Sequence, residues 1–547
     1  MSGNRHRVLG GGGQHVLDYL KRMQAENQNF YYEVQIEADQ SIGNMFWADA
    51  ASRLNFNYFG DAVKLDMSYR ENRHRVPLAY FSGINHHGQP VLFGCALLVD
   101  ESESDFLWLF QSWLRAMSGR YPVTITTEPD RILQMAVRLV LPQTRHRLCK
   151  NGIFKETKEK LAPLYQSHPT FETEFHKCID DTDSIQEFES CWSSLLERYY
   201  VMDNEWLQSM YGARQHWVPV YLRDSFFGEI FATEKSEGSF FDGFFNAATT
   251  FQLFFLQYER AISSWHEKEL KADYDTNNMI PILKTPSPME KQAANIYTKR
   301  IFLKFQEELV ETLANPATKV DDCGTMSTYR VAKFGEEHKA HTVRLMDLEM
   351  KASCTCQLFD FSGIICRHIL AVFRAKNVLM LPPHYILKRW TRKAKTGSSL
   401  DEHGSEGPIS PQESGTVRYN NLRQEAIKYV EEGAKSIHIY KVAMDALQEA
   451  GKKVAALKNQ SRFFTQGIYL TNGSSQEVST GEANQTTSSQ SMAEKEKKIR
   501  ELTAELDSIN QKSEFYRTNL LSILHDVEDQ KSKMSVKVQN SKLSLKE

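Results

Sequence analysis

The sequence predicts an α+β protein with several domains: a mixed β-sheet covered by helices, a small zinc module and a C-terminal coiled coil. Strand-like apolar runs precede and separate amphipathic helical runs between residues 61 and 149. Four residues of metal-ligand type lie close together between residues 354 and 368. Apolar residues three and four apart recur between residues 499 and 527. A chain of 547 residues is too long for one core, so we expect two or three domains plus linkers.

Composition excludes several classes of protein. The formal net charge of -3 means that any contact with nucleic acid would need a local basic patch. The eight cysteines include a metal-type cluster, which favours a reducing compartment over a disulfide framework. We find no apolar run long enough to span a bilayer, and the first residues lack the apolar core of a secretory signal. The sequence therefore predicts a soluble intracellular protein without a membrane partner.

The N-terminal region is expected to be simple. Residues 1–13 are rich in glycine and are predicted to be disordered. Residues 14–60 are predicted to contain a short helix over 14–28 and a hairpin, Tyr31 to Trp47, around a polar turn.

The pattern is sharper between residues 61 and 149. Three strand-like runs, V-K-L-D-M-S-Y, P-L-A-Y-F-S-G-I and V-L-F-G-C-A-L-L-V, follow one another with polar connections. A helix over 104–117 has one apolar face and is followed by the strand V-T-I-T-T, a helix over 129–141 and a short strand over 146–149. The order β-β-β-α-β-α-β predicts a mixed sheet covered by helices.

The middle of the chain reads mostly as helix. We assign residues 61–270 to one domain with a helical insertion, and residues 271–340 to a connector of helix and strand. The insertion is rich in aromatic residues, which we interpret as core packing. These residues are Trp192, Tyr199, Tyr200, Trp206 and Trp217.

The metal-type cluster reads Cys-x-Cys, nine residues, Cys-x-His, and consists of Cys354, Cys356, Cys366 and His368. Three thiolates and one imidazole match a closed tetrahedral Zn²⁺ site, which has a structural role because no position stays open for water. We expect Cys354 and Cys356 to lie on one side of a strand, and Cys366 and His368 to begin a helix. The alternative is a chance grouping of four residues. Residues 341–395 are assigned to this module and the basic run that follows it.

That basic run is K-R-W-T-R-K-A-K. It predicts a nuclear import signal or a phosphate-contacting arm, and the alternative is a solvated start of a linker. Two smaller clusters, the pair His86 and His87 and the trio at 145–147, are interpreted as surface or sheet-edge groups. The basic residues of the run are Lys388, Arg389, Arg392, Lys393 and Lys395.

The C-terminal part is expected to alternate between linker and helix: a linker over 396–417, a helix over 418–460, a disordered linker over 461–492, a coiled coil over 493–532 and a tail over 533–547. The coiled coil has one polar core residue, Ser513, and predicts a parallel dimer. The alternative is a helix that folds back onto its own chain. The residues of the seam are Ile499, Leu502, Leu506, Ile509, Tyr516, Leu520, Ile523 and Val527.

Several long motifs carry a family resemblance. F-G-D-A-V-K-L-D-M-S-Y, P-L-A-Y-F-S-G-I-N-H-H-G-Q-P-V-L-F-G-C-A-L-L-V-D-E-S and W-L-F-Q-S-W-L-R-A-M-S-G resemble the plant FAR-RED IMPAIRED RESPONSE and FAR-RED ELONGATED HYPOCOTYL family, which is related to Mutator-like transposases. The Cys/His cluster resembles the SWIM zinc finger of that family. The resemblance covers roughly residues 14–390. It implies an RNase H-like core, a nuclear location, transcriptional regulation linked to light signalling, and homo- or heterodimers with family members.

The chain departs from the family pattern at its start. Typical members carry an N-terminal zinc-binding domain that reads DNA, and no such Cys/His cluster precedes residue 14 here. Contact with DNA is therefore open, but we do not expect sequence-specific binding by this chain alone. A shortened member or an incomplete gene model would explain the start, and a shortened member could act as an interfering partner of full-length relatives.

The resemblance also implies three carboxylates that hold two divalent metals in an active transposase. Asp66 matches the first, and Glu128 stands where the family pattern T-D-x-D has aspartate, with Asp130 following. Glu237 in K-S-E matches the third. Cys149 remains from a C-x-W-H-like stretch, but its histidine is missing. We predict that the three carboxylates are vestigial and the chain is not an enzyme; the alternative is a metal-dependent DNA transposase or nuclease.

Overall fold

The computed structural model describes residues 10–36, 41–69, 78–228, 240–245, 249, 251–278, 280–396 and 436–468, with a few further positions between 422 and 433. The chain divides into two compact units, Met1–Lys428 and Tyr429–Glu547, which are described separately.

The first unit is built on a seven-stranded mixed sheet with the order β1-β2-β5-β4-β3-β6-β7. β3 pairs parallel with β6, and β6 pairs parallel with β7, whereas the other neighbours are antiparallel. From residue 61 onward the order of elements is the predicted β-β-β-α-β-α-β, and the predicted mixed sheet covered by helices is confirmed. The strands are β1 (Tyr31–Ile36), β2 (Ile42–Ala48), β3 (Ala62–Tyr69), β4 (Leu78–Ile84), β5 (Pro90–Leu97), β6 (Thr124–Thr127) and β7 (Arg145–Leu148).

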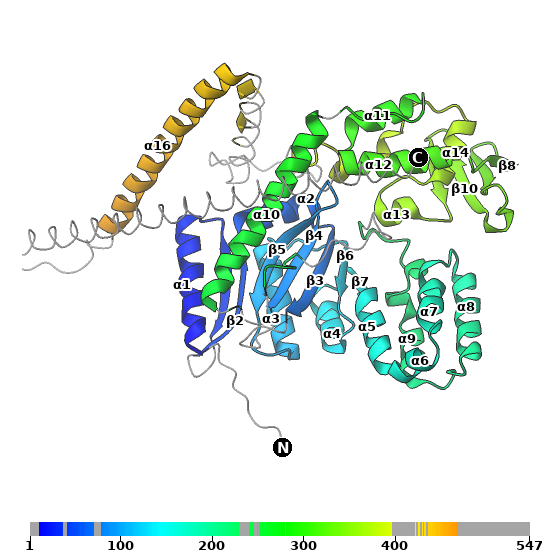
Figure 1. Ribbon diagram of the computed structural model, residues 1–547, viewed down its shortest axis with the longest axis horizontal. Helices are drawn as coiled ribbons and strands as arrows, with labels where there is room; N and C mark the ends of the chain where they lie inside the picture. Colours follow the sequence, from blue (N-terminus) through cyan, green and yellow to red (C-terminus); the bar gives the residue numbers. More distant parts are fainter. Residues whose placement is uncertain are drawn as a thin grey trace, which may run out of the picture. The chain divides into compact units, whose positions relative to one another are not determined.

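Both faces of this sheet are covered, because successive side chains of a strand point to opposite faces. In β4, Ala79 and Phe81 belong to the core under α2 (Ala50–Phe59), α3 (Glu103–Ala116) and α4 (Arg131–Val140). Leu78 and Tyr80 belong to the core under α1 (Gly10–Glu26) and α10 (Phe251–Asn278). Figure 1 shows the strands between these two groups of helices. The near-continuous apolar runs of the sequence reflect this burial on both sides.

The N-terminal helix and hairpin extend the sheet. β1 and β2 add two antiparallel strands to its β5 edge. α1 begins at Gly10, inside the segment that we predicted to be disordered. Glycine disfavours helix, but Val16 and Leu20 of α1 are fully buried against the sheet, so tertiary packing overrides the local preference.

The helical insertion follows β7 and has its own aromatic core. Trp192, Tyr199 and Trp217 are buried in it, as predicted, and Trp206 packs at its margin. The prediction was wrong for Tyr200, which is 95% exposed and has positive φ just after the end of α8. The helices are α5 (Lys150–Lys160), α6 (Ala162–Ser167), α7 (Phe171–Asp180), α8 (Ile185–Arg198) and α9 (Glu205–Gly212).

The remainder of the first unit is built around a second, four-stranded antiparallel sheet with the order β11-β10-β9-β8. Its strands and three of its helices share one buried core. The expected division at residue 340 falls between β9 and β10, which pair along their whole length. The elements are α11 (Pro288–Ile296), α12 (Lys299–Glu311), β8 (Ala317–Asp322), β9 (Met326–Val331), β10 (His341–Met346), β11 (Lys351–Cys354), α13 (Leu358–Ser362) and α14 (Arg367–Ala375).

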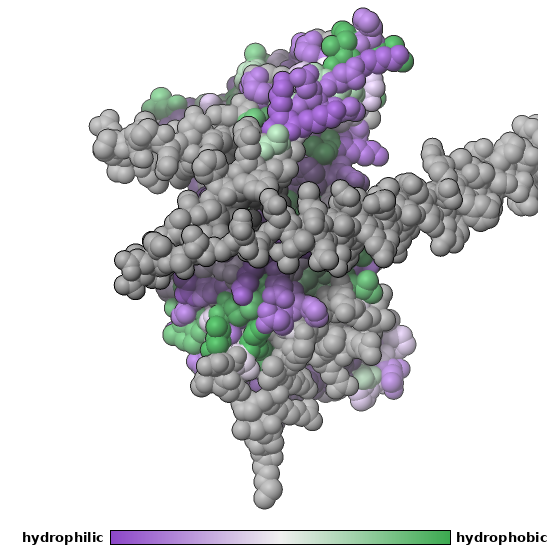
Figure 2. All heavy atoms as spheres, turned by 90° about the vertical axis from the view of Figure 1, so that its left-hand side faces the viewer, coloured by the Kyte–Doolittle hydropathy of each residue, from purple (hydrophilic) through white to green (hydrophobic). Residues whose placement is uncertain are grey.

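The second unit contains the helix α16 (Ile437–Ile468), which runs past the predicted end at residue 460. The predicted coiled-coil seam, Ile499 to Val527, lies outside the described residues, so the coiled coil stays a prediction. Among the described helices, none has both the length and the apolar character needed to cross a membrane. The coloured residues in Figure 2 show hydrophilic surface beside smaller apolar patches.

Candidate functional site

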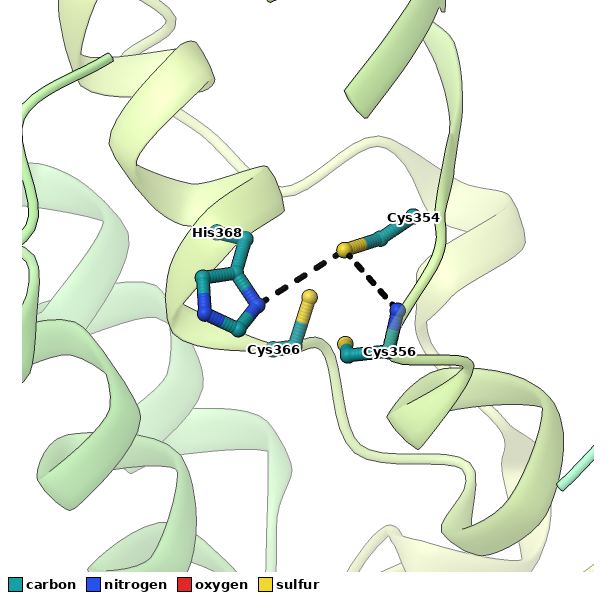
Figure 3. A group of neighbouring side chains, drawn as sticks. All are labelled: Cys354, Cys356, Cys366 and His368. Atoms are coloured by element: carbon teal, nitrogen blue, oxygen red, sulfur yellow. Dashed lines mark hydrogen bonds between the residues drawn. The ribbon is translucent and has the colours of Figure 1, made fainter. Parts of the chain in front are cut away.

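The four ligand-type residues converge from the end of β11 and from the start of α14. Cys354 ends β11, Cys356 lies in the turn that follows, and Cys366 and His368 lie at the start of α14. Figure 3 shows the four side chains directed toward one point between the turn and the helix. We expected both Cys354 and Cys356 on a strand, but the strand ends at Cys354. Gln357, with a φ of 53°, then turns the chain back.

The distances among the donor atoms fit a tetrahedral metal ion. All four lie within 4.8 Å of one another, and Cys354 Sγ is 3.6 Å from His368 Nδ1. Zinc–sulfur bonds of about 2.3 Å in a tetrahedron place sulfur atoms about 3.8 Å apart. The backbone N–H of Cys356 donates to Cys354 Sγ, and that of Ile369 donates to Cys366 Sγ, both at 3.5 Å. The geometry and donor set are therefore consistent with zinc.

The charge state of the metal-free cluster makes zinc binding dependent on pH. Hydrogen bonds from Cys354 and Cys366 hold the pKa of the Cys356 thiol well below its usual value, because they stabilise its thiolate. Burial raises the pKa of Cys366 well above its usual value. Without a metal, the three cysteines are therefore not all thiolates, and some of them keep their protons. A zinc ion would displace the remaining thiol protons, so its affinity must fall as the pH falls.

Charged residues fasten the cluster to the rest of its core. Arg367, beside the ligands, donates two bonds to the carboxylate of Glu308 on α12, from Nε at 3.0 Å and from Nη2 at 2.6 Å. Such a forked contact fixes orientation as well as distance. The hydroxyl of Tyr385 donates to Ala352 O at 2.9 Å and accepts from Ala352 N at 2.7 Å. The strand and the helix that carry the ligands are thus held independently of the metal.

The first inherited carboxylate has a lysine partner. Asp66 on β3 is 4% exposed, and Lys64 Nζ lies 3.0 Å from its Oδ2. Residues two apart on a strand face the same side, so the ammonium reaches the place where a bridging metal ion would bind. Burial alone would lower the pKa of Lys64, but the negative charges of Asp66 and Glu128 outweigh it and raise that pKa. Lys64 was missed in the sequence, although its spacing from Asp66 was visible.

The second carboxylate lies nearby without forming a metal cluster. Glu128 follows β6, and Asp130 has a structural role, because its side chain accepts from Ile132 N and Leu133 N and begins α4. Cys149 is half-buried and directly precedes α5, and its side chain makes no capping hydrogen bond to that helix. Among the described residues, Asp66 and Glu128 do not belong to any group of three close metal-ligand side chains. Glu237 lies outside the described residues.

Most basic side chains of the run after the zinc module contact other parts of the protein. Arg389 is buried, forms an ion pair with Asp61, and donates from Nη2 to Ile84 O at 3.0 Å. Lys395 forms an ion pair with Glu269 of α10. These two contacts join the run to the first sheet and to α10.

The other basic residues divide between structure and surface. Arg392 donates to the carbonyls of Ala294 and Tyr297 at the end of α11, where a cation is favoured by the helix dipole. Lys388 and Lys393 are exposed. The import signal stays a prediction, and only these two lysines of the run present exposed side chains for it.

The structure places the histidine pair, His86 and His87, differently from the sequence prediction. His86 and His87 follow β4 and are 2% and 3% exposed, so the prediction of surface groups was wrong. Both rings point toward Asp273 of α10, which no local pattern connects with them. The trio at 145–147 does lie on an edge strand, β7, as expected.

Comparison with known proteins identifies the chain's relatives. Residues 62–156 match the MULE transposase domain, and residues 341–377 match the SWIM zinc finger. The chain is 56% identical over 537 residues to Protein FAR1-RELATED SEQUENCE 9 of Arabidopsis thaliana, which covers 98% of this chain and 97% of that protein. The chain belongs to the FAR1-related sequence family.

Other members of the FAR1-related sequence family are also similar. Protein FAR1-RELATED SEQUENCE 5 of Arabidopsis thaliana is 51% identical, over 100% of this chain and 70% of that protein. Protein FAR-RED IMPAIRED RESPONSE 1 of the same plant is 36% identical over 470 residues, which is 85% of this chain and 56% of that protein. The resemblance that the sequence motifs indicated is confirmed, and the SWIM match contains all four clustered ligands.

Proposed function

We propose that this FAR1-related protein is a nuclear transcription regulator that descends from a transposase and takes part in light-responsive development. One of its relatives carries a name that refers to a far-red response, and its two matched domains are of transposase and zinc-finger type. It acts by docking: the SWIM module and the predicted coiled coil bind other proteins of the family or DNA. Pairing through the 499–527 seam yields homo- or heterodimers.

Zinc in this proposal is structural. Cys354, Cys356, Cys366 and His368 would supply four ligands, which close the coordination sphere and leave no site for water. When bound, the ion holds the β11 turn against α14. The ion pair between Arg367 and Glu308 supports the zinc site by orienting α14. Within the described ranges, these two residues do not contact a group that would react.

We propose that the chain is not an enzyme on the basis of one observation, the ion pair between Lys64 and Asp66. An ammonium at 3.0 Å neutralises the carboxylate that a Mg²⁺ ion would need as a ligand. Mg²⁺ also requires near-ideal octahedral geometry, which the longer side chain of Glu128 disturbs. The contacts of Asp130 with the start of α4 leave it committed to a helix cap.

A reporter experiment tests the proposal. The full chain is fused to an unrelated DNA-binding domain and expressed in plant cells with a promoter that carries its sites. We expect a change in reporter transcription that Asp66→Asn leaves intact and that loss of the zinc ligand Cys366 abolishes. An unchanged reporter, together with Asp66-dependent strand transfer by the purified chain in Mg²⁺ or Mn²⁺, would refute the proposal in favour of a transposase.

A further inference from the structure

The turn between β4 and β5 holds two adjacent histidines in a fixed arrangement. Asn85 Oδ1 accepts hydrogen bonds from the backbone N–H groups of His87 and Gln89, both at 2.9 Å. Gly88 has a φ of 71° and closes the turn by donating to Asn85 O. Thr298 Oγ1 donates to His86 O at 2.7 Å. The backbone that carries both rings is therefore pinned from several sides.

Both rings meet one carboxylate oxygen on α10. His86 Nε2 is 3.1 Å from Asp273 Oδ1, and His87 Nε2 is 2.9 Å from the same atom. One potential ligand atom from each of the three residues lies within 4.8 Å of the others. Zinc bonds of about 2.0–2.1 Å to nitrogen and oxygen give tetrahedral edges of about 3.3 Å. The convergence is close to the geometry of three ligands around one ion.

When His86 bonds only to Asp273, one nitrogen of its ring has no hydrogen-bond partner in the part of the chain that the structure describes. If Nε2 donates to Asp273, the other nitrogen of a neutral ring is an acceptor. His86 Nδ1 is buried, makes no hydrogen bond among the described residues, and lies 3.8 Å from Glu269 Oε1, which is also an acceptor. Two acceptors then face each other in a buried place, which is unfavourable.

A metal ion removes this conflict. Coordination through Nε2 moves the proton of His86 to Nδ1, where it points at Glu269. A metal-ligating histidine usually donates its second N–H to a carboxylate in this way. Glu269 and Asp273 are four residues apart and therefore lie on one face of α10. Lys395 pairs with Glu269, and Asp273 supplies a negative charge to the ion.

We propose that His86, His87 and Asp273 form a second metal site, separate from the SWIM module, for a divalent transition-metal ion such as Zn²⁺. Two imidazoles and a carboxylate suit Zn²⁺ better than Mg²⁺ or Ca²⁺, which prefer oxygen ligands. The Asp273 side chain is 26% exposed, which gives the ion a way in. The bound ion fastens the β4–β5 turn to α10, and so ties that helix to the first sheet.

Metal content of the purified full chain, after loading with Zn²⁺ and removal of excess ion, tests the site. We expect two equivalents for the wild type and one each for His87→Gln and Asp273→Asn. Cys366→Ser separates the two sites, because it removes the SWIM zinc and leaves the new one. His146→Gln is the matched control, since His146 is a half-buried ring bonded to Thr127 on another part of the sheet, and it retains two equivalents.

Two further measurements keep the proposal falsifiable if a variant folds poorly. Co²⁺ loaded into the otherwise wild-type protein should give thiolate charge-transfer bands from the SWIM cluster and, in addition, ligand-field bands from the new site. Asp273→Asn should remove only the second set of bands and leave the thiolate bands unchanged. Glu269→Gln should lower the affinity about 10- to 100-fold with the stoichiometry unchanged. One equivalent of Zn²⁺ in the wild type that Asp273→Asn retains would overturn the proposal. The two histidines and Asp273 would then form only a hydrogen-bonded contact between the β4–β5 turn and α10.

Discussion

The SWIM cluster and the inherited carboxylates are both sets of metal-type donors, but among their described residues only those of the SWIM cluster converge on one point. Cys354 to His368 is a single short segment, whereas Asp66 and Glu128 come from different strands. Zinc ligands contribute to folding free energy, so losing one destabilises the domain. Clustered carboxylates repel one another, and an ammonium such as that of Lys64 relieves the repulsion. A structural metal site therefore resists loss, and a catalytic one can be replaced by an ion pair.

The largest effect is expected from Cys366→Ser, which tests the structural half of this comparison. Loss of one ligand should remove the SWIM zinc and destabilise the core around α14 by about 4 kcal/mol or more, because a metal site is lost together with a buried thiolate. Metal analysis and thermal unfolding measure the change. Cys323→Ser is the matched control, because Cys323 is exposed, and it should behave like the wild type. Equal stability of the two variants would show that the core folds without metal.

A smaller but still large effect is expected from Arg389→Ala, which breaks the link between the two regions. Arg389 is buried, but the Asp61 side chain that its removal leaves without this partner is 32% exposed, so the cost should be about 2–3 kcal/mol. Lys388→Ala, next to it and exposed, should change stability by less than about 0.5 kcal/mol. Denaturant unfolding compares the two. A nuclear-import defect in Lys388→Ala with normal stability would separate the import prediction from the structural role.

A pH-dependent effect is expected from Glu290→Gln in the core beside the SWIM cluster. Burial would raise the pKa of Glu290, but hydrogen bonds from Thr285, Lys284 N and Gln306 lower it overall. A lowered folded pKa means that the stabilisation is present above the unfolded pKa of about 4.3 and is lost as the pH falls through the folded value. The variant should lose about 1–3 kcal/mol at pH 7.

The difference between the unfolding free energies of wild type and Glu290→Gln should stay constant down to about pH 4.3 and shrink as the pH falls below that value. Zinc release on acidification weakens both proteins alike, so the difference between their unfolding free energies isolates the carboxylate. A difference that stays constant below about pH 4.3 as well would contradict the assigned hydrogen bonds.

The smallest change in stability is expected from Lys64→Thr, which sharpens the catalytic half of the comparison. An ion pair with a partly exposed lysine contributes about 0–1 kcal/mol, so unfolding should change little. Freed of the ammonium, Asp66 should bind Mn²⁺ more tightly than in the wild type, which titration calorimetry can measure. Strand transfer should remain absent, because Glu128 and Asp130 are unchanged. Recovery of strand transfer would mean that Lys64 alone keeps the site inactive.

The sequence by itself determined the order of elements from β3 to β7 and the cluster of four ligand-type residues in the SWIM match. Both signals are local: strand and helix periodicity repeats within a few residues, and the ligands lie within one short segment. Only the tertiary structure decided the contacts between residues that are distant in sequence. It placed His86 and His87 against Asp273, folded Arg389 onto Asp61, and started α1 within a glycine run. In each case the partner is distant in sequence, and the burial that sets the chemistry exists only once the chain has packed.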